Sequence, residues 1–567
     1  MTRHGQQLAL VGLALLAARP ALADDRTPAR RWFPDRPVAW NEHDDVDVPR
    51  APAASHLQDL DQSLLIRDSI ANEIDRALAL ERGRPADDVN ALDEVPCSTW
   101  FCPRNHVRAM SPDEVAAGPA VASPRLPLRI VKGKDQGATP GFQAIDAAGR
   151  KFNVKVDPRA AVGLTSGPEM IGERIFHAAG YNVPGAFIVD FGPDDIVVDA
   201  RASYRLYGVQ PRPLTRDRVL RLLDNAARLP DGRWRAVAVP WIGGRILGGF
   251  DMLDRRADDP NDRIAHQHRR SLRASWVLFA WLAELDPSSI NSLDSYVEED
   301  GRHFVRHYII DFGATLGSAS TSAKGLAQTG EYMIEVGRTL KAYFSLGLYR
   351  RPFQDERAQW KQAVADRPSL GWFPAERFDP DAFRTNRKGP AHIRRTDRDL
   401  YWGAKLVTSF SDEQIAAIVA TARMSDADSA SLTRALRIRR DIIGRRYLRA
   451  LAAVEAPDVS LDGARVCFDD LALQRGYATP EELRYAVEVS DGMGTRLLSE
   501  ERAPDSSHSC VPFVGREPGT GYRIVEIRSR FGGTAGRPEA VSKASRVHLR
   551  WRAGESRFVV VGLERDE

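Results

Sequence analysis

The sequence changes character twice, and these changes limit the folds that the chain can adopt. From about residue 125 to 245 it is rich in short strand-like runs separated by glycine-containing turns. From 246 to 455 helical patterns dominate, and from 456 to 567 strand patterns return. With 567 residues the chain is too long for one small core, and we expect two to four domains. This order predicts an α+β protein with a β-rich lobe, a helical lobe and a small C-terminal antiparallel β module.

The first residues have the pattern of a secretion signal. Arg3 and His4 precede an apolar run from Leu8 to Ala18, and small residues end at Ala23 before two aspartates. The apolar run is about half as long as a membrane span requires, although an uncleaved anchor is the alternative. We therefore expect a signal peptide over residues 1–23, cleaved near Ala23. The mature chain is expected to be periplasmic or secreted, with no transmembrane span.

The next hundred residues, 24–124, are rich in Pro, Asp and Arg. They contain one stretch with apolar residues at helical spacing, residues 57–80. The remainder has turn residues and isolated hydrophobic anchors. We predict an extended N-terminal arm with one helix, wrapped around a larger body.

Four cysteines agree with an oxidising compartment. Cys97 and Cys102 are close enough to bridge a small loop around Trp100, and Cys467 and Cys510 are the other natural pair. An even number of cysteines in an exported chain favours disulfides. Free thiols are the first alternative, and a zinc site is a more distant one.

The charge of the chain excludes one class of partner. Lys and Arg number 80 and Asp and Glu 77, so the formal net charge is +3. A dedicated nucleic-acid-binding protein would show a strong basic excess or a basic face. We therefore expect no nucleic acid among the partners.

Polar side chains occur at particular junctions of the predicted strands and helices. A lysine lies within a predicted strand, and two glutamates lie on the helix that follows it. An aspartate and an asparagine come just after a buried helix. Another aspartate ends the strand of "VRHYIIDFGATLG" and precedes a Phe-Gly turn. In chain order these residues are Lys155, Glu169, Glu173, Asp286, Asn291 and Asp311.

In these residues the sequence resembles the atypical branches of the protein-kinase-like superfamily. The resemblance covers roughly residues 125 to 455. More narrowly, "PGF", "HAAGYNVP", "DDPNDRIAHQHRR" and "VRHYIIDFGATLG" look like a group of uncharacterised exported bacterial proteins of this type. The resemblance implies a two-lobed kinase-like fold, with the β-rich N-lobe at 125–245 and the helical C-lobe at 246–455. It also implies a metal-bound nucleotide, Mg²⁺ or Mn²⁺ with ATP.

The resemblance assigns roles that phosphoryl transfer requires, namely placed phosphates, charge-offsetting metal and an oriented acceptor. Lys155 would hold phosphates, and a helix glutamate would orient it. The resemblance favours Glu169 for that partner, whereas the distance from Lys155 slightly favours Glu173. Asn291 and Asp311 would supply the hard oxygen ligands that Mg²⁺ prefers.

Two further positions complete the expected site. Asp286 precedes Asn291 on the same loop and could accept the proton of an acceptor hydroxyl. The loop around Gly133, Gly137 and Gly141 could bring backbone N–H groups near phosphates. Each position also has a plain structural explanation, because a strand often ends in an Asp-Phe-Gly turn and an aspartate before proline often caps a turn.

The chain departs from the family pattern in two places. Glu284 and Leu285 stand where a His-Arg pair precedes the catalytic aspartate in kinases, and the glycine loop is not G-x-G-x-x-G. Two functions therefore stay open. The first is an exported phosphotransferase or nucleotidyl transferase acting on an unknown protein or glycan. The second is a catalytically inactive kinase-like scaffold that binds an envelope protein or a glycan.

Overall fold

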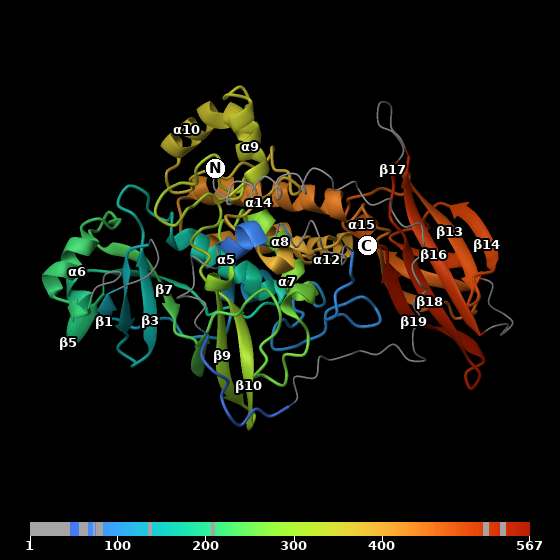
Figure 1. Cartoon of the computed structure of the whole chain (residues 1–567), viewed down its shortest axis with the longest axis horizontal. Coiled ribbons are helices and arrows are strands. Elements are labelled where there is room, and N and C mark those ends of the chain that lie inside the picture. The colour runs from blue at the N-terminus through green and yellow to red at the C-terminus, as the bar shows by residue number, and fades with distance from the viewer. Residues whose placement is uncertain are drawn as a thin grey trace, which may run out of the picture.

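The computed structural model of the chain describes residues 46–55, 66–71, 74, 83–133, 139–205, 210–513, 521–532 and 540–567. The predicted signal peptide and most of the helix predicted at 57–80 lie outside these residues. The described part is a mixed α+β protein with several sheets, which confirms the predicted class. Figure 1 shows a large sheet at one end, helices in the middle and further sheets at the other end.

The first region forms a seven-stranded sheet in the order β4-β7-β3-β2-β1-β5-β6. Neighbouring strands are antiparallel except β1 and β5, which are parallel. Helix α6 (Arg216–Leu223) buries Val219 and Leu223 against one face. The strands are β1 (Leu128–Gly133), β2 (Gly141–Ile145), β3 (Lys151–Val156), β4 (Phe187–Phe191), β5 (Ile196–Tyr204), β6 (Arg212–Pro213) and β7 (Trp234–Pro240).

Helix α5 (Ser166–Ala179) covers the other face of this sheet and buries Ile171 and Ile175 beside Val237. Thr165 directly precedes the helix, and its own side chain makes no capping hydrogen bond. The Asp157 carboxylate accepts hydrogen bonds from the backbone N–H groups of Thr165 and Ser166 at 2.9 and 2.7 Å. A buried carboxylate from the preceding strand end therefore caps this helix.

The middle region is built around helix α8 (Ser275–Leu282), in which every side chain is buried. Ser411 and Gln414 form a capping box at the start of α13. The surrounding helices are α7 (Arg270–Arg273), α11 (Pro390–Ile393), α12 (Asp397–Val407), α13 (Asp412–Ala420) and α14 (Asp426–Tyr447). Helices α9 (Val336–Phe344) and α10 (Arg357–Asp366) lie at the edge of this region in Figure 1.

The expectation of a helical region from 246 to 455 is incomplete. It also contains a three-stranded antiparallel sheet of β8 (Arg245–Gly248), β9 (Ser292–Glu299) and β10 (Arg302–Ile309). Strands β9 and β10 form a hairpin that pairs Ser292 with Ile309 at its base. This hairpin sets the loop before β9 beside the turn after β10.

The C-terminal region is antiparallel β-structure, as predicted. One sheet contains β11 (Val454–Val459), β12 (Arg465–Asp470) and β15 (His508–Pro512). The other contains β13 (Leu483–Asp491), β14 (Arg496–Arg502), β16 (Tyr522–Phe531), β18 (Ser545–Arg552) and β19 (Arg557–Arg565), and β17 (Ala540–Val541) pairs with β16. Their inner side chains belong to the same hydrophobic core as the helices.

The described parts of the arm pack along the middle of the molecule, as the blue segments in Figure 1 show. Asp93 is buried and forms ion pairs with Arg270, Arg398 and Arg565 at 2.6–2.8 Å. These arginines come from the helical region and from the last strand. The arm is therefore fastened to both regions by buried charge.

Both predicted disulfides are present, Cys97–Cys102 in the arm and Cys467–Cys510 between β12 and β15. Among the described residues, no helix is long and apolar enough to cross a membrane.

Candidate functional site

The side chain of Lys155 lies between two carboxylates from distant parts of the chain. Its Nζ donates to Glu169 Oε2 at 2.9 Å and to Asp311 Oδ1 at 2.8 Å. Lys155 and Glu169 are buried, whereas the Asp311 side chain is 41 % exposed. Burial alone would lower the pKa of Lys155, but the charges of Asp311 and Glu169 outweigh it and raise that pKa above its usual range. Lys155 is therefore a fixed cation.

The two candidate glutamates of α5 have different partners. Glu173 lies one turn after Glu169 and pairs with Arg174 at 2.6 Å, away from the lysine. Burial raises the pKa of Glu173 to about 8 despite this arginine. Of the two alternatives left open by the sequence, Glu169 is the one that contacts Lys155.

Asp286 and Asn291 lie on the loop between α8 and β9, and the loop is held by hydrogen bonds of its own. Asn291 Nδ2 donates to the Asp286 carbonyl oxygen at 2.8 Å and lies 3.3 Å from its carboxylate. The Ile310 N–H donates to the Asn291 carbonyl oxygen at 3.0 Å. This last bond fixes Asn291 beside the residue that precedes Asp311.

Asp311 itself follows β10 in an uncommon backbone conformation. Its φ is +65°, in the left-handed region that non-glycine residues rarely adopt. Such strain often occurs at functional sites, where the surroundings enforce it. Ile309, the last residue of β10, packs against the main core, so the strand is anchored where the chain turns.

A cleft of about 310 Å³ opens next to Lys155, between the seven-stranded sheet and the β8–β10 sheet. Its polar end contains Lys155, Glu169 and Asp311. The rest is lined mainly by apolar side chains: Phe142, Val154, Val239, Pro240, Trp241, Ile242, Ile246, Leu293 and Ile310. The cleft thus combines an apolar slot with a charged end.

A second, much smaller cavity shares Ile310 and Asp311 with the first. It is also lined by Asp286, Asn291 and Glu284. Asp311 therefore lines both cavities, together with Lys155 and Glu169 in the first and with Asp286 and Asn291 in the second. Of the six predicted polar residues, Glu173 lines neither.

Glu284 belongs to this site, although from the sequence alone it stood out only because it replaces part of the His-Arg pair of kinases. Its Oε1 accepts the Asp286 N–H at 2.7 Å, and its buried Oε2 has no hydrogen-bond partner among the residues that the structure describes. Burial raises the pKa of Glu284 to about 8, although the nearby Lys324 ammonium acts in the opposite direction. The sequence shows an acid two residues before Asp286, but its burial is known only from the structure.

The glycine loop is only partly visible. Gly137 lies outside the described residues, and Gly133 and Gly141 end β1 and begin β2. A Cβ on Gly141 would lie 2.1 Å from the Val154 carbonyl oxygen, so only glycine fits beside β3. Gly141 thus has a packing role that does not depend on phosphate.

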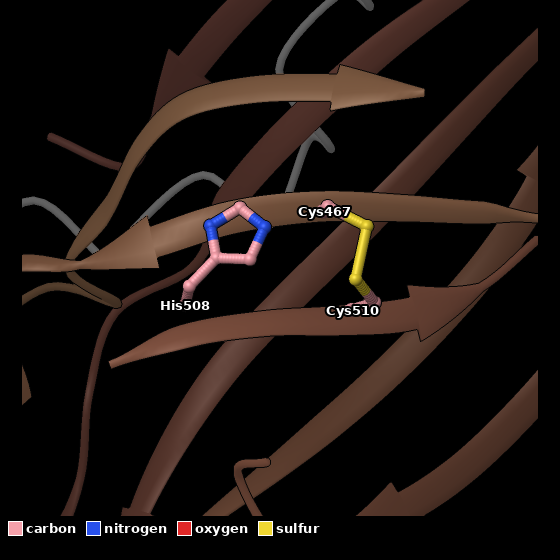
Figure 2. A group of neighbouring side chains, drawn as sticks. All are labelled: Cys467, His508 and Cys510. Carbon is pink, nitrogen blue, oxygen red and sulfur yellow. A yellow bond between two sulfur atoms is a disulfide. The ribbon is translucent and has the colours of Figure 1, made fainter. Parts of the chain in front are cut away.

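A second group with metal-ligand side chains lies far from this cleft, in the C-terminal sheets. Figure 2 shows Cys467, His508 and Cys510 on adjacent strands, with the two sulfur atoms bonded to each other. His508 Nδ1 contacts Asp469 at 2.8 Å. Because both sulfurs are used in the disulfide, this group offers no thiolate to a metal.

No family model, curated protein or solved structure matches the chain.

Proposed function

We propose that the chain is an exported kinase-like phosphotransferase or nucleotidyl transferase that uses metal-bound ATP. In this proposal the seven-stranded sheet with α5 is the N-lobe, and the region from β8 to α14 is the C-lobe. The observation that carries it is the placement of Lys155 between Glu169 and Asp311 at the charged end of the cleft. The two disulfides support an extracellular or periplasmic location.

The cleft suits a nucleotide in shape and chemistry. Its apolar slot, which Pro240, Trp241 and Ile242 help to line, would hold a base. The Trp241 backbone N–H donates to the Lys151 carbonyl oxygen, and the Lys151 ammonium lies 3.4 Å from the centre of the Trp241 ring. The Lys155 ammonium would then attract the phosphates at the charged end.

The donor set near Asp311 fits Mg²⁺ or Mn²⁺. Asp311 offers a partly exposed carboxylate, and Asn291 donates through its amide nitrogen, which directs the amide oxygen elsewhere. One carboxylate and one amide oxygen, completed by phosphate oxygens and water, are typical of Mg²⁺ bound with a nucleotide. When bound, the ion would offset the negative charge of the phosphates.

Asp286 is proposed to orient the acceptor hydroxyl and take its proton. Its backbone is held by Glu284 and by the Asn291 side chain. Because these bonds already fix the loop, the Asp286 carboxylate would lose less orientational freedom when the acceptor binds than it would on a loop without them. The proposed acceptor is a protein or a glycan.

The inactive scaffold stays as the second candidate because of one observation. The Lys155 cation is already paired with two carboxylates, so phosphate has to displace or share the Asp311 contact. Glu284 and Leu285 in place of His-Arg point the same way. In that case the arm and the C-terminal sheets would bind an envelope protein or a glycan.

Label transfer separates these candidates. The mature protein is incubated with Mg²⁺ or Mn²⁺ and ATP labelled at either the α- or the γ-phosphate, alone and with envelope extract. Transfer of the γ-label would support a phosphotransferase, and transfer of the α-label a nucleotidyl transferase. Loss of transfer in Asp286→Asn, but not in the distant surface variant Asp231→Asn, would assign the role of Asp286. No transfer under any condition would favour the scaffold.

A further inference from the structure

Helix α9 carries an apolar face that the protein leaves in solvent. Val336, Leu340, Tyr343 and Phe344 lie on one side of the helix at helical spacing. Tyr343 and Phe344 are 76 % and 77 % exposed, and no residue of α9 is buried. Leu346 and Leu348, just after the helix, are even more exposed. Soluble proteins rarely expose so many large apolar side chains together.

The base of this segment is firmly attached, so its exposure is a property of the fold. The Met333 N–H donates to the Asn386 carbonyl oxygen at 2.9 Å before the helix. Beyond the helix, Trp360 Nε1 donates to the Lys324 carbonyl oxygen at 2.7 Å. Figure 1 shows α9 and α10 projecting at the edge of the molecule. The apolar face therefore lies on a projecting segment whose two ends are attached to the rest of the protein.

The charged side chains within α9 and just after it are cations, whereas carboxylates flank this segment. Glu335 lies directly before the helix. From residue 336 to 351 there are four cations and no carboxylate. Arg350 and Arg351 are paired with Asp355 and with Glu331 from outside this stretch. Arg338 donates to the Gly330 carbonyl oxygen, and Lys341 is exposed on α9 with no ion pair within the described part of the chain.

We propose that the apolar face of α9 docks onto the surface of an anionic lipid bilayer. A short helix with Leu, Phe and Tyr on one side and Lys or Arg on the other is typical of interfacial membrane binding. The apolar side chains would enter the boundary of the acyl chains, while Arg338 and Lys341 would face the lipid phosphates.

Vesicle flotation of the full mature protein tests this proposal. Wild-type protein is expected to float with vesicles that contain anionic phospholipid, more weakly with zwitterionic vesicles, and less at high salt. Leu340→Ser/Phe344→Ser should lower the partition coefficient at least about tenfold. Leu461→Ser changes a fully exposed leucine in the C-terminal region and should bind as wild type does.

Arg338→Gln/Lys341→Gln should reduce binding to anionic vesicles and leave the weak zwitterionic binding unchanged. Circular dichroism checks that all variants are folded. The proposal is overturned if folded wild-type protein floats with no vesicle, or if the α9 variants float as well as wild type. It is also overturned if the protein does not bind vesicles but forms a dimer that Leu340→Ser/Phe344→Ser abolishes, since a second copy would then cover this face.

Discussion

Lys155 and Asp311 are 156 residues apart in the chain, and their side chains form an ion pair of 2.8 Å. This pair connects the seven-stranded sheet to the turn after β10. Glu169 completes it from α5. The three residues join a strand, a helix and a strained turn at the end of the cleft.

Lys155→Met is expected to destabilise the protein strongly. It leaves the Glu169 carboxylate buried without its cation, and breaking one side of a buried pair costs about 3–5 kcal/mol. The free energy of unfolding from urea titration measures this cost. Lys155→Met/Glu169→Gln should recover part of the loss, because no buried charge is then left unpaired. Equal stability of Lys155→Met and wild type would contradict the buried pair.

Glu284 should make stability depend on pH. Because burial raises its pKa to about 8, the folded protein keeps a proton that the unfolded chain releases above about pH 4.3. The free energy of unfolding should therefore fall as the pH rises from about 4.3 to 8. Glu284→Gln retains an acceptor for the Asp286 N–H and should make this decline smaller. Identical pH profiles for variant and wild type would rule out a raised pKa at Glu284.

The two disulfides should contribute unequally. Cys467 and Cys510 close a loop of 43 residues, and Cys97 and Cys102 close one of 5. The chain-entropy model gives losses of about 4 kcal/mol and about 2 kcal/mol on removing them. Urea unfolding of the two double-serine variants compares them directly. A larger loss for the Cys97 and Cys102 variant would show that local packing around Trp100 outweighs loop length.

Asp93→Asn should loosen the contact between the arm, the helices and the last strand. It removes the carboxylate shared by Arg270, Arg398 and Arg565, all of them buried. We expect a loss of about 3–5 kcal/mol and faster hydrogen exchange in β19. Asp87→Asn, at a neighbouring exposed position, serves as the control. Unchanged exchange in β19 would mean that the arm does not stabilise the last strand.

The order of strands and helices could be predicted from the sequence because burial leaves a periodic pattern. The strands at 522–531, 545–552 and 557–565 are examples, as is the capped helix at 412–420. The β9 strand was missed because it follows directly on the Asn291 loop. The cap of α5 was also missed, since Asp157 reaches it only when the chain folds back.

The residues of the candidate site could be predicted from the sequence, but the contacts between them could not. Glu169 and Glu173 lie on one face of α5, four residues apart, so spacing alone could not choose between them. Which glutamate pairs with Lys155 depends on two contacts made in the folded chain. Arg174 forms an ion pair with Glu173, and Asp311, which is distant in sequence, forms one with Lys155. Glu284 could be recognised as a site residue only once the structure showed that its side chain is buried.

Calorimetric titration of Mg²⁺-ATP and Mn²⁺-ATP into the mature protein, with Asp311→Ala alongside, tests the proposed metal–nucleotide cleft most directly. We expect wild-type protein to bind metal-bound ATP, to bind ATP much more weakly when the metal is chelated, and to lose the metal-dependent part in Asp311→Ala. Asp231→Ala should bind as wild type does. Folded wild-type protein that binds ATP with neither metal, or an Asp311→Ala variant that binds as tightly as wild type, would contradict the account.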